Sequence, residues 1–176
     1  AYDLMAQMAE TVPVGCEGLT FFPYLAGPGT QEVDMDTRGI FWGIEMHHGR
    51  AHFARAVMES LAFVFKRSLE EMARSGVHYT DIRVLGGGAK SGLWNRMKAD
   101  ILGRTVGTME CAESASLGMA VLQAVGGGYY SSVKDAVDVM VRPASLVEPD
   151  PANRAAADDA YGRFAELEAI HLKKQR

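Results

Sequence analysis

The chain has only two cysteines, Cys16 and Cys111, which stand far apart and form no CxxC pair. Two such residues cannot build the disulfide framework of a small secreted domain. The first residues also lack the basic and then apolar order of a secretory leader. We therefore expect a protein of the reducing cytoplasm.

Long apolar runs and an excess of positive charge are missing as well. No unbroken apolar stretch approaches the ~18 residues that cross a bilayer. The 18 Lys and Arg residues stand against 22 Asp and Glu residues, for a formal net charge of −4. Because the basic residues form no stripe, nucleic acid is not an expected partner. Hydrophobic residues make up 48% of the 176 residues, which is enough for the core of one globular domain.

The hydrophobic periodicities predict an α/β domain, a mixed sheet flanked by helices. Strands are expected within residues 18–27, 39–45, 82–85 (a buried strand) and 105–111, and helices over 1–12, 50–74, 91–102, 115–124, 133–141 and 153–173. Residues 142–151 contain prolines and predict an extended linker. The apolar stripe of the longest helix is expected to consist of Ala54, Val57 or Met58, Leu61, Phe65, Leu69 and Met72. Gly76 is expected to cap that helix in the left-handed conformation.

The segment IRVLGGGAKSGLW is the strongest local motif, because an apolar strand runs into Gly86, Gly87 and Gly88 just before a helix that starts near Ser91. Glycines at a strand end let backbone N–H groups approach a phosphate without a Cβ in the way. The triplet matches neither GxGxxG nor GxxxxGK[ST], so it licenses neither an NAD-binding Rossmann site nor a P-loop. From these residues alone, the segment can be interpreted either as a plain tight turn or as a nucleotide-binding turn.

Three histidines lie close together in the sequence. His48 and His52 are four residues apart and would share a face if both were helical, and His47 is adjacent. A metal site needs a third protein ligand or more, and the spacing supplies none. We therefore expect a histidine-rich helix start and no metal site.

Other polar side chains give weaker signals. Cys16 and Cys111 have no identifiable His or acid partner, which favours unreactive thiols. Glu113 follows a strand and precedes a helix, where its carboxylate could cap the helix, the interpretation we prefer, or reach a ligand. Asp34 and Asp36 fit a solvated loop better than a cation site.

Residues 39–59, GIFWGIEMHHGRAHFARAVME, carry a long gapped pattern that resembles the second signature of the FGGY carbohydrate kinases. Its elements are Gly39, Phe41, Gly43, Ile44, seven residues, and then His52, Phe53, Ala56, Val57, Met58 and Glu59. The stretches GLTFFPYLAG, GGGAKSGLW with ADILG, and the spaced Glu113, Leu117 and Gly118 follow in the family's order. The resemblance covers essentially all 176 residues and is strongest to the C-terminal half of the xylulokinases.

This resemblance implies an actin-like ATPase lobe with a ribonuclease-H-like core. In these kinases a sugar sits between two lobes, and MgATP lies mainly on the C-terminal one. By position, the family's nucleotide-binding turn corresponds to Gly86, Gly87, Gly88, Ala89 and Ser91. The resemblance thus implies ATP and Mg²⁺ as cofactors and phosphoryl transfer to a ketose such as D-xylulose.

The resemblance also implies what this chain does not carry. The catalytic Asp, the Asp-x-Gly-Thr phosphate loop and nearly all sugar contacts belong to the family's N-terminal lobe, so we expect no catalytic residue here and no turnover by the isolated chain. Where xylulokinases commonly have GERTP, residues 27–31 are GPGTQ, and Met35 replaces a usual proline. A kinase for glycerol, ribulose or a related sugar therefore stays an alternative, as does a non-catalytic nucleotide-binding module. Exposure of the surface that faces the N-terminal lobe would be compatible with a homodimer.

Overall fold

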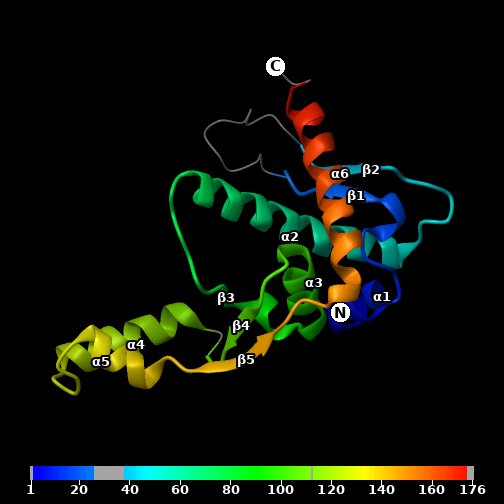
Figure 1. The fold of residues 1–176 in the computed structure, drawn as a ribbon. Coiled ribbons are helices and arrows are strands. Elements are labelled where there is room, and N and C mark those ends of the chain that lie inside the picture. The colour runs from blue at the N-terminus through cyan, green and yellow to red at the C-terminus, as the bar shows by residue number, and fades with distance from the viewer. Residues whose placement is uncertain (1, 26–37, 112, 174–176) are drawn as a thin grey trace.

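The structure is a computed structural model in which residues 2–25, 38–111 and 113–173 are described (Figure 1). The elements of this part of the chain are, in order, α1 (Tyr2–Glu10), η1 (Cys16–Gly18), β1 (Thr20–Phe22), β2 (Ile40–Trp42), α2 (Arg50–Arg74), β3 (Arg83–Val84), η2 (Gly87–Lys90), α3 (Gly92–Leu102), β4 (Val106–Met109), α4 (Ser114–Gly126), α5 (Val133–Met140), β5 (Pro143–Val147), η3 (Pro151–Asn153) and α6 (Arg154–Lys173). Each predicted helix is present, with small shifts at its ends. The expected loop acids Asp34 and Asp36, residues 27–31 and Met35 lie outside the described residues.

The described strands form two sheets. In the larger one, of order β3-β4-β5, β3 runs parallel to β4 and β5 runs antiparallel to it, so the predicted mixed sheet is confirmed. The early strands β1 and β2 do not join this sheet but pair antiparallel with each other, with Phe21 opposite Phe41. Helix α3 packs against the larger sheet on one side and against α2 on the other.

The main hydrophobic core lies where β1, α2 and α6 meet. Phe22 and Phe164 are fully buried, and their ring centroids are 5.1 Å apart. Phe63 of α2 completes the aromatic cluster, 5.3 Å from Phe164. Ala157 of α6 is also fully buried, whereas Ile170, near the C-terminal end of the same helix, is 47% exposed.

The predicted apolar stripe of α2 is only partly correct. Leu61, Phe65 and Met72 are each more than a third exposed. The buried face contains the predicted Ala54, further small residues, a charged pair and one phenylalanine: Ala54, Arg55, Ala56, Glu59, Ser60, Ala62 and Phe63. Small side chains let α1 and β1 approach closely, and a buried ion pair is a feature that hydrophobic periodicity does not detect. The predicted C-terminal cap is confirmed, with Gly76 at φ +82°.

Two predictions for the larger sheet need correction. Residues 142–151 are not a plain linker, because Pro143–Val147 form strand β5, with Thr108 opposite Ser145. A proline is tolerated at the first residue of an edge strand, so Pro143 does not exclude one. The strand expected at 82–85 is shorter and less buried than predicted, since β3 comprises Arg83 and Val84, and Leu85 is 47% exposed.

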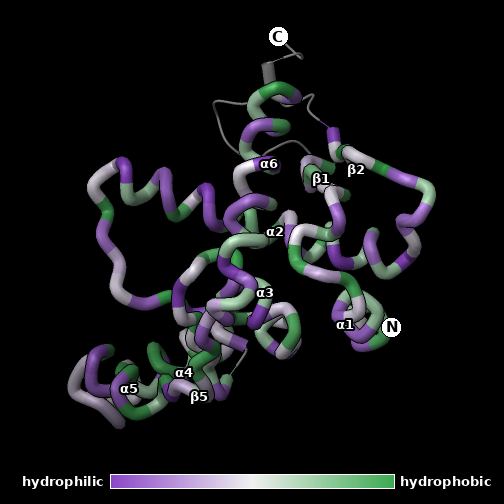
Figure 2. The backbone as a smooth tube through the Cα atoms, turned by 45° about the vertical axis from the view of Figure 1, so that its right-hand side comes forward, coloured by the Kyte–Doolittle hydropathy of each residue, from purple (hydrophilic) through white to green (hydrophobic). Residues whose placement is uncertain are grey.

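Helices α4 and α5 form a hairpin at the far side of the larger sheet from α6 (Figure 1). Val121 is the buried residue of α4 and Ala136 that of α5. Figure 2 shows that α4 is nonetheless rich in hydrophobic residues. Part of that apolar surface therefore borders open space next to the ends of β3 and β4.

Candidate functional site

The glycine turn, residues 86–91, joins β3 to α3. Gly86 has φ +76°, a conformation that a residue with a Cβ rarely adopts. The 3₁₀ turn η2 follows at once, and the Ala89 N–H donates to the Gly86 carbonyl oxygen at 3.1 Å. The turn thus reverses the chain within a few residues and brings backbone groups to the end of the strand.

The start of α3 fixes the shape of this turn. Ser91 is the N-cap, and its Oγ accepts a hydrogen bond from the Trp94 N–H at 3.3 Å. The buried Asn95 side chain donates from Nδ2 to the Ala89 carbonyl oxygen at 2.7 Å. The turn is therefore held against the N-terminus of α3, where free N–H groups and the helix dipole favour a negative charge.

The three glycines differ in what surrounds them. A Cβ built on Gly86 or Gly87 would meet no heavy atom of the described residues within 4 Å. A Cβ on Gly88 would lie 2.5 Å from the Trp94 ring. The close packing of Trp94 therefore requires a glycine at position 88. The backbone at Gly86 and Gly87 is instead accessible, because no described residue fills the space beside it.

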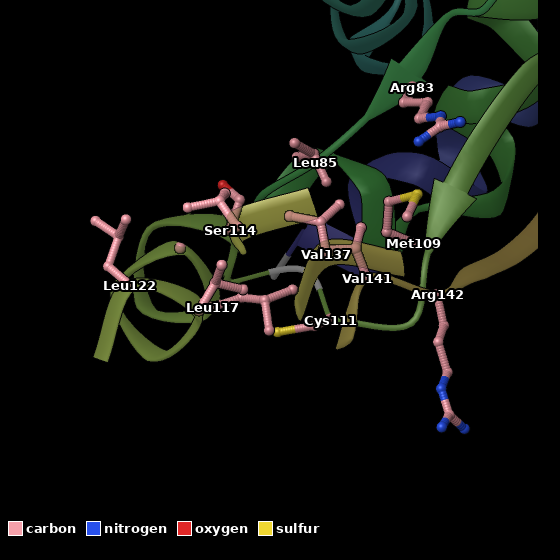
Figure 3. A pocket seen from close by; sticks show the side chains of 13 residues that line it. Arg83, Leu85, Met109, Cys111, Ser114, Leu117, Leu122, Val137, Val141 and Arg142 are labelled. Carbon is pink, nitrogen blue, oxygen red and sulfur yellow. The ribbon is translucent and has the colours of Figure 1, made fainter. Parts of the chain in front are cut away.

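An apolar cavity of about 440 Å³ lies beside the turn, between the carboxyl ends of β3 and β4 and helices α4 and α5. Leu85, which directly precedes Gly86, lines it together with Met109 of β4 and Leu117 of α4 (Figure 3). Cys111 and Ser114 also face it. Such a pocket suits a flat, largely apolar group attached to a charged one.

Glu113 occupies the predicted N-cap position of α4, but its side chain makes no capping hydrogen bond. Its Oε1 lies 3.8 Å from Lys90 Nζ, and both side chains are mostly exposed. An exposed pair of this kind contributes little to stability. The contact with Lys90 does place Glu113 next to the glycine turn. Because the Glu113 side chain makes no capping hydrogen bond, the capping interpretation of its carboxylate is wrong.

Much of the motif over residues 39–59 has a structural role. Phe41 and Phe53 pack edge to face with ring centroids 5.0 Å apart. Glu59 Oε1 accepts hydrogen bonds from Arg55 Nε at 2.7 Å and from the Gly15 N–H at 3.2 Å. Burial raises the pKa of Glu59, and the Arg55 guanidinium opposes that shift. These residues hold the chain around Gly15 rather than contacting the glycine turn.

The histidines are arranged differently from the prediction. His48 precedes α2, and His52 lies in its first turn, where Nδ1 accepts the Gly49 N–H at 3.1 Å. Glu17, which the sequence spacing did not bring into consideration, lies with its Oε2 3.2 Å from His47 Nε2. A residue that is distant in the sequence thus lies beside the histidines.

Cys16 lies in the interior of the molecule, where its thiol is protected. Cys16 is buried, and its thiol donates to the His52 carbonyl oxygen at 2.9 Å. Burial raises its pKa to about 12, and nearby Glu59 adds to the shift. The predicted unreactive thiol fits Cys16, because so high a pKa leaves almost no thiolate at neutral pH.

Residues 1–127 match the model of the FGGY family of carbohydrate kinases, C-terminal domain. The chain belongs to this family. It is 33% identical to a xylulose kinase of Staphylococcus epidermidis over 176 residues, 100% of this chain and 35% of that protein. It is 36% identical to a gluconokinase of Bacillus subtilis over 144 residues, 80% of this chain and 27% of that protein. The chain thus spans about a third of the length of these relatives.

The fold agrees with this family. The crystal structure of xylulose kinase from Rhodospirillum rubrum superimposes with a TM-score of 0.80 and 29% sequence identity, covering 96% of this chain and 33% of that one. The expected actin-like ATPase fold of an FGGY lobe is therefore confirmed. Among the described residues, no helix combines the length and apolar character that crossing a membrane requires.

Proposed function

We propose that this chain is the nucleotide-binding lobe of a cytoplasmic FGGY sugar kinase, and that the complete enzyme transfers the γ-phosphoryl group of MgATP to a ketose such as D-xylulose. The observation that carries the proposal is the glycine turn, where Gly86 and Gly87 border open space at the N-terminus of α3 in an FGGY chain. The catalytic base and most sugar contacts would lie in an N-terminal lobe.

The turn would bind phosphate oxygens through its backbone. Gly86 and Gly87 carry no Cβ that would keep a ligand away from the main chain, and α3 directs its positive end toward the same place. The Ser91 hydroxyl already accepts the Trp94 N–H, so its own hydrogen is available for donation to an oxygen. Gly88 and Ala89 would act by keeping the turn in shape.

The cavity beside Leu85 would receive the nucleoside. Its walls are largely aliphatic, which suits the faces of a purine base. MgATP supplies the phosphoryl group, and Mg²⁺ would arrive on its phosphates, because residues 86–91 offer no carboxylate. Catalysis of this kind consists mainly of positioning and charge stabilisation, to which a rigid phosphate-binding turn contributes.

The acceptor is proposed from the relatives. A relative that matches the whole chain is named xylulose kinase, which supports a ketose. The matches to a gluconokinase and to a glycerol kinase support a second candidate, a kinase for a sugar acid or a polyol. Both candidates would use the same nucleotide site and would differ in sugar-binding residues outside this chain.

The test is Gly87→Val in the natural gene product that contains this chain. A valine at this accessible position should hinder the nucleotide and raise the KM for ATP at least several-fold, with the sugar KM unchanged. Gly162→Val is the matched control, because Gly162 also has open space around its Cβ position among the described residues but lies on α6. An unchanged KM for ATP in Gly87→Val would contradict the site assignment.

A further inference from the structure

A cluster of three histidines and one carboxylate lies apart from the glycine turn. Glu17 Oε2 is 3.2 Å from His47 Nε2 and 3.0 Å from His52 Nε2. Glu17, His47 and His48 each offer one ligand atom, and these atoms lie within 4.8 Å of one another. Three potential metal ligands therefore converge from two segments that are 30 residues apart in the sequence.

The position of Glu17 is fixed by its backbone. The four residues Gly15, Cys16, Glu17 and Gly18 all have positive φ, with Glu17 at +50°. This left-handed conformation disfavours a residue with a Cβ. It persists here because Glu59 accepts the Gly15 N–H and Arg163 donates to the Gly15 carbonyl oxygen. The fold thus holds a strained residue so that its carboxylate faces the histidines, and strain of this kind is concentrated at functional sites.

We propose that Glu17, His47 and His48 form a binding site for a divalent transition metal such as Zn²⁺, with Glu45 and His52 orienting the ligands. Zn²⁺ bonds to His nitrogen and carboxylate oxygen are about 2.0–2.2 Å long, so ligand atoms in a tetrahedral site lie roughly 3.3 Å apart. The 3.2 Å between Glu17 Oε2 and His47 Nε2 already fits that separation. The two separations that involve His48 are at most 4.8 Å, and rotation of the exposed Glu17 and His47 side chains would have to shorten them.

The donor set selects the class of metal. Two imidazoles and one carboxylate suit Zn²⁺, Ni²⁺ or Co²⁺, whereas Mg²⁺ prefers oxygen ligands. The ligand set of the proposed site therefore differs from the oxygen ligands of the Mg²⁺ that would accompany ATP. Three protein ligands would leave a fourth position for water.

Neighbouring groups orient two of the three ligands. His52 Nδ1 accepts the Gly49 N–H, so the ring proton is on Nε2 and points at the Glu17 carboxylate. His47 lies between two carboxylates, with Nε2 3.2 Å from Glu17 Oε2 and Nδ1 3.6 Å from Glu45 Oε2. A metal bound between Nε2 and Glu17 would replace the first contact, and the ring proton would then face Glu45 from Nδ1. Metal-binding histidines are commonly oriented by a carboxylate in this manner.

His48 has to change its hydrogen bonding. Its Nδ1 accepts the Glu45 N–H at 3.0 Å, and its Nε2 is buried with no hydrogen-bond partner among the described residues. Coordination through Nε2 would move the ring proton to Nδ1, with no net proton release, and the bond from Glu45 would be lost. The loss of one hydrogen bond is small compared with the gain from a metal–ligand bond. Coordination would also give the buried Nε2 a partner.

The test is a Zn²⁺ titration of the purified 176-residue chain against a chromophoric chelator. We expect one Zn²⁺ per chain, and at least a ~10-fold weaker affinity in both His47→Gln and Glu17→Gln. Glu17→Gln keeps an acceptor for His52 and is the variant less prone to disturb the fold, which circular dichroism checks. His78→Gln is the control, because His78 is exposed and outside the cluster.

Three results would overturn the proposal: no saturable Zn²⁺ binding by the unmodified chain, folded Glu17→Gln and His47→Gln chains that bind as tightly as the unmodified one, or an equal loss in His78→Gln. A second measurement uses Co²⁺ as a probe. A tetrahedral nitrogen and oxygen site should give a visible absorption spectrum that disappears in His48→Gln. Persistence of that spectrum in His48→Gln would contradict the assigned ligand set.

Discussion

Two glycine-containing turns of this molecule, at residues 86–91 and 15–18, use positive φ angles for opposite purposes. In the turn at residues 86–91, Gly86 and Gly87 leave backbone accessible next to a helix N-terminus. In the turn at residues 15–18, the backbone is clamped by Glu59 and Arg163, and what it presents is a side chain, that of Glu17. One turn is thus suited to binding through the main chain, and the other to fixing a carboxylate.

The difference depends on what surrounds each turn. Around Gly15, a Cβ would lie 3.4 Å from Ala160, and the buried Arg55 and Glu59 side chains stand behind the turn. Around Gly87 the corresponding space is open among the described residues. Glycine in a turn therefore indicates a binding backbone only where nothing else in the fold occupies the space that its missing Cβ leaves.

The largest expected effect comes from removing Glu59, one of the two side chains that hold residues 15–18 in place. Glu59→Ala removes the acceptor of the Gly15 N–H and leaves the buried Arg55 without a neutralising carboxylate, so we expect a loss of roughly 3–5 kcal/mol in the free energy of unfolding. Urea denaturation measures it. The control is Asp138→Ala, which breaks the exposed Lys134–Asp138 pair and should cost under about 1 kcal/mol. Equal effects of the two substitutions would show that residues 15–18 are not clamped as described.

A smaller effect on the free energy of unfolding should distinguish Gly87 from Gly88 in the turn at residues 86–91. Gly88→Val forces a side chain against the Trp94 ring and should destabilise the fold by roughly 1–3 kcal/mol. Gly87→Val should change the unfolding free energy by less than about 0.5 kcal/mol. Thermal unfolding of both variants checks this, and a Gly87→Val chain as unstable as Gly88→Val would contradict the open position of Gly87.

The smallest effect concerns pH. The hydrogen bond from His52, with the charges of His52 and His47, lowers the pKa of Glu17 below its ordinary value of 4.5. An acid whose pKa is lower in the folded state stabilises the fold above the unfolded pKa, and this contribution is lost as the pH falls through the folded pKa. Glu17→Gln should therefore lower the Tm slightly at pH 6 and by less at pH 3. A Tm difference that grows as the pH falls would contradict the predicted contribution of Glu17 to stability.

The sequence was sufficient to predict local features. The glycine turn, the Ser91 start of α3 and the Gly76 end of α2 follow from residue types that act within one turn of helix. Strand β5 was missed because Pro143 suggests a linker, and only its pairing with β4 makes an edge strand. Pairing between distant segments is not encoded in a local pattern.

The same reason explains which site residues could be predicted. Residues 86–91 are contiguous, so their arrangement can be inferred from one segment. Glu17 reaches His47 only because two glycines, a buried ion pair and helix α6 together hold residues 15–18 in a left-handed turn. The Arg55–Glu59 pair on the buried face of α2 was likewise invisible to hydrophobic periodicity, although the i,i+4 spacing of opposite charges was a usable signal.

The most direct test of the nucleotide site is an ADP titration of the ¹⁵N-labelled chain followed by NMR, which detects weak binding and locates it. We predict that the amide signals of residues 86–91, with those of the first turn of α3 and of residues lining the adjoining cavity, shift together and saturate. The Gly87→Val chain should show much smaller shifts, and Gly162→Val should behave like the unmodified chain. Shifts confined to other segments, or none at high ADP concentration, would contradict a nucleotide-binding role for the glycine turn.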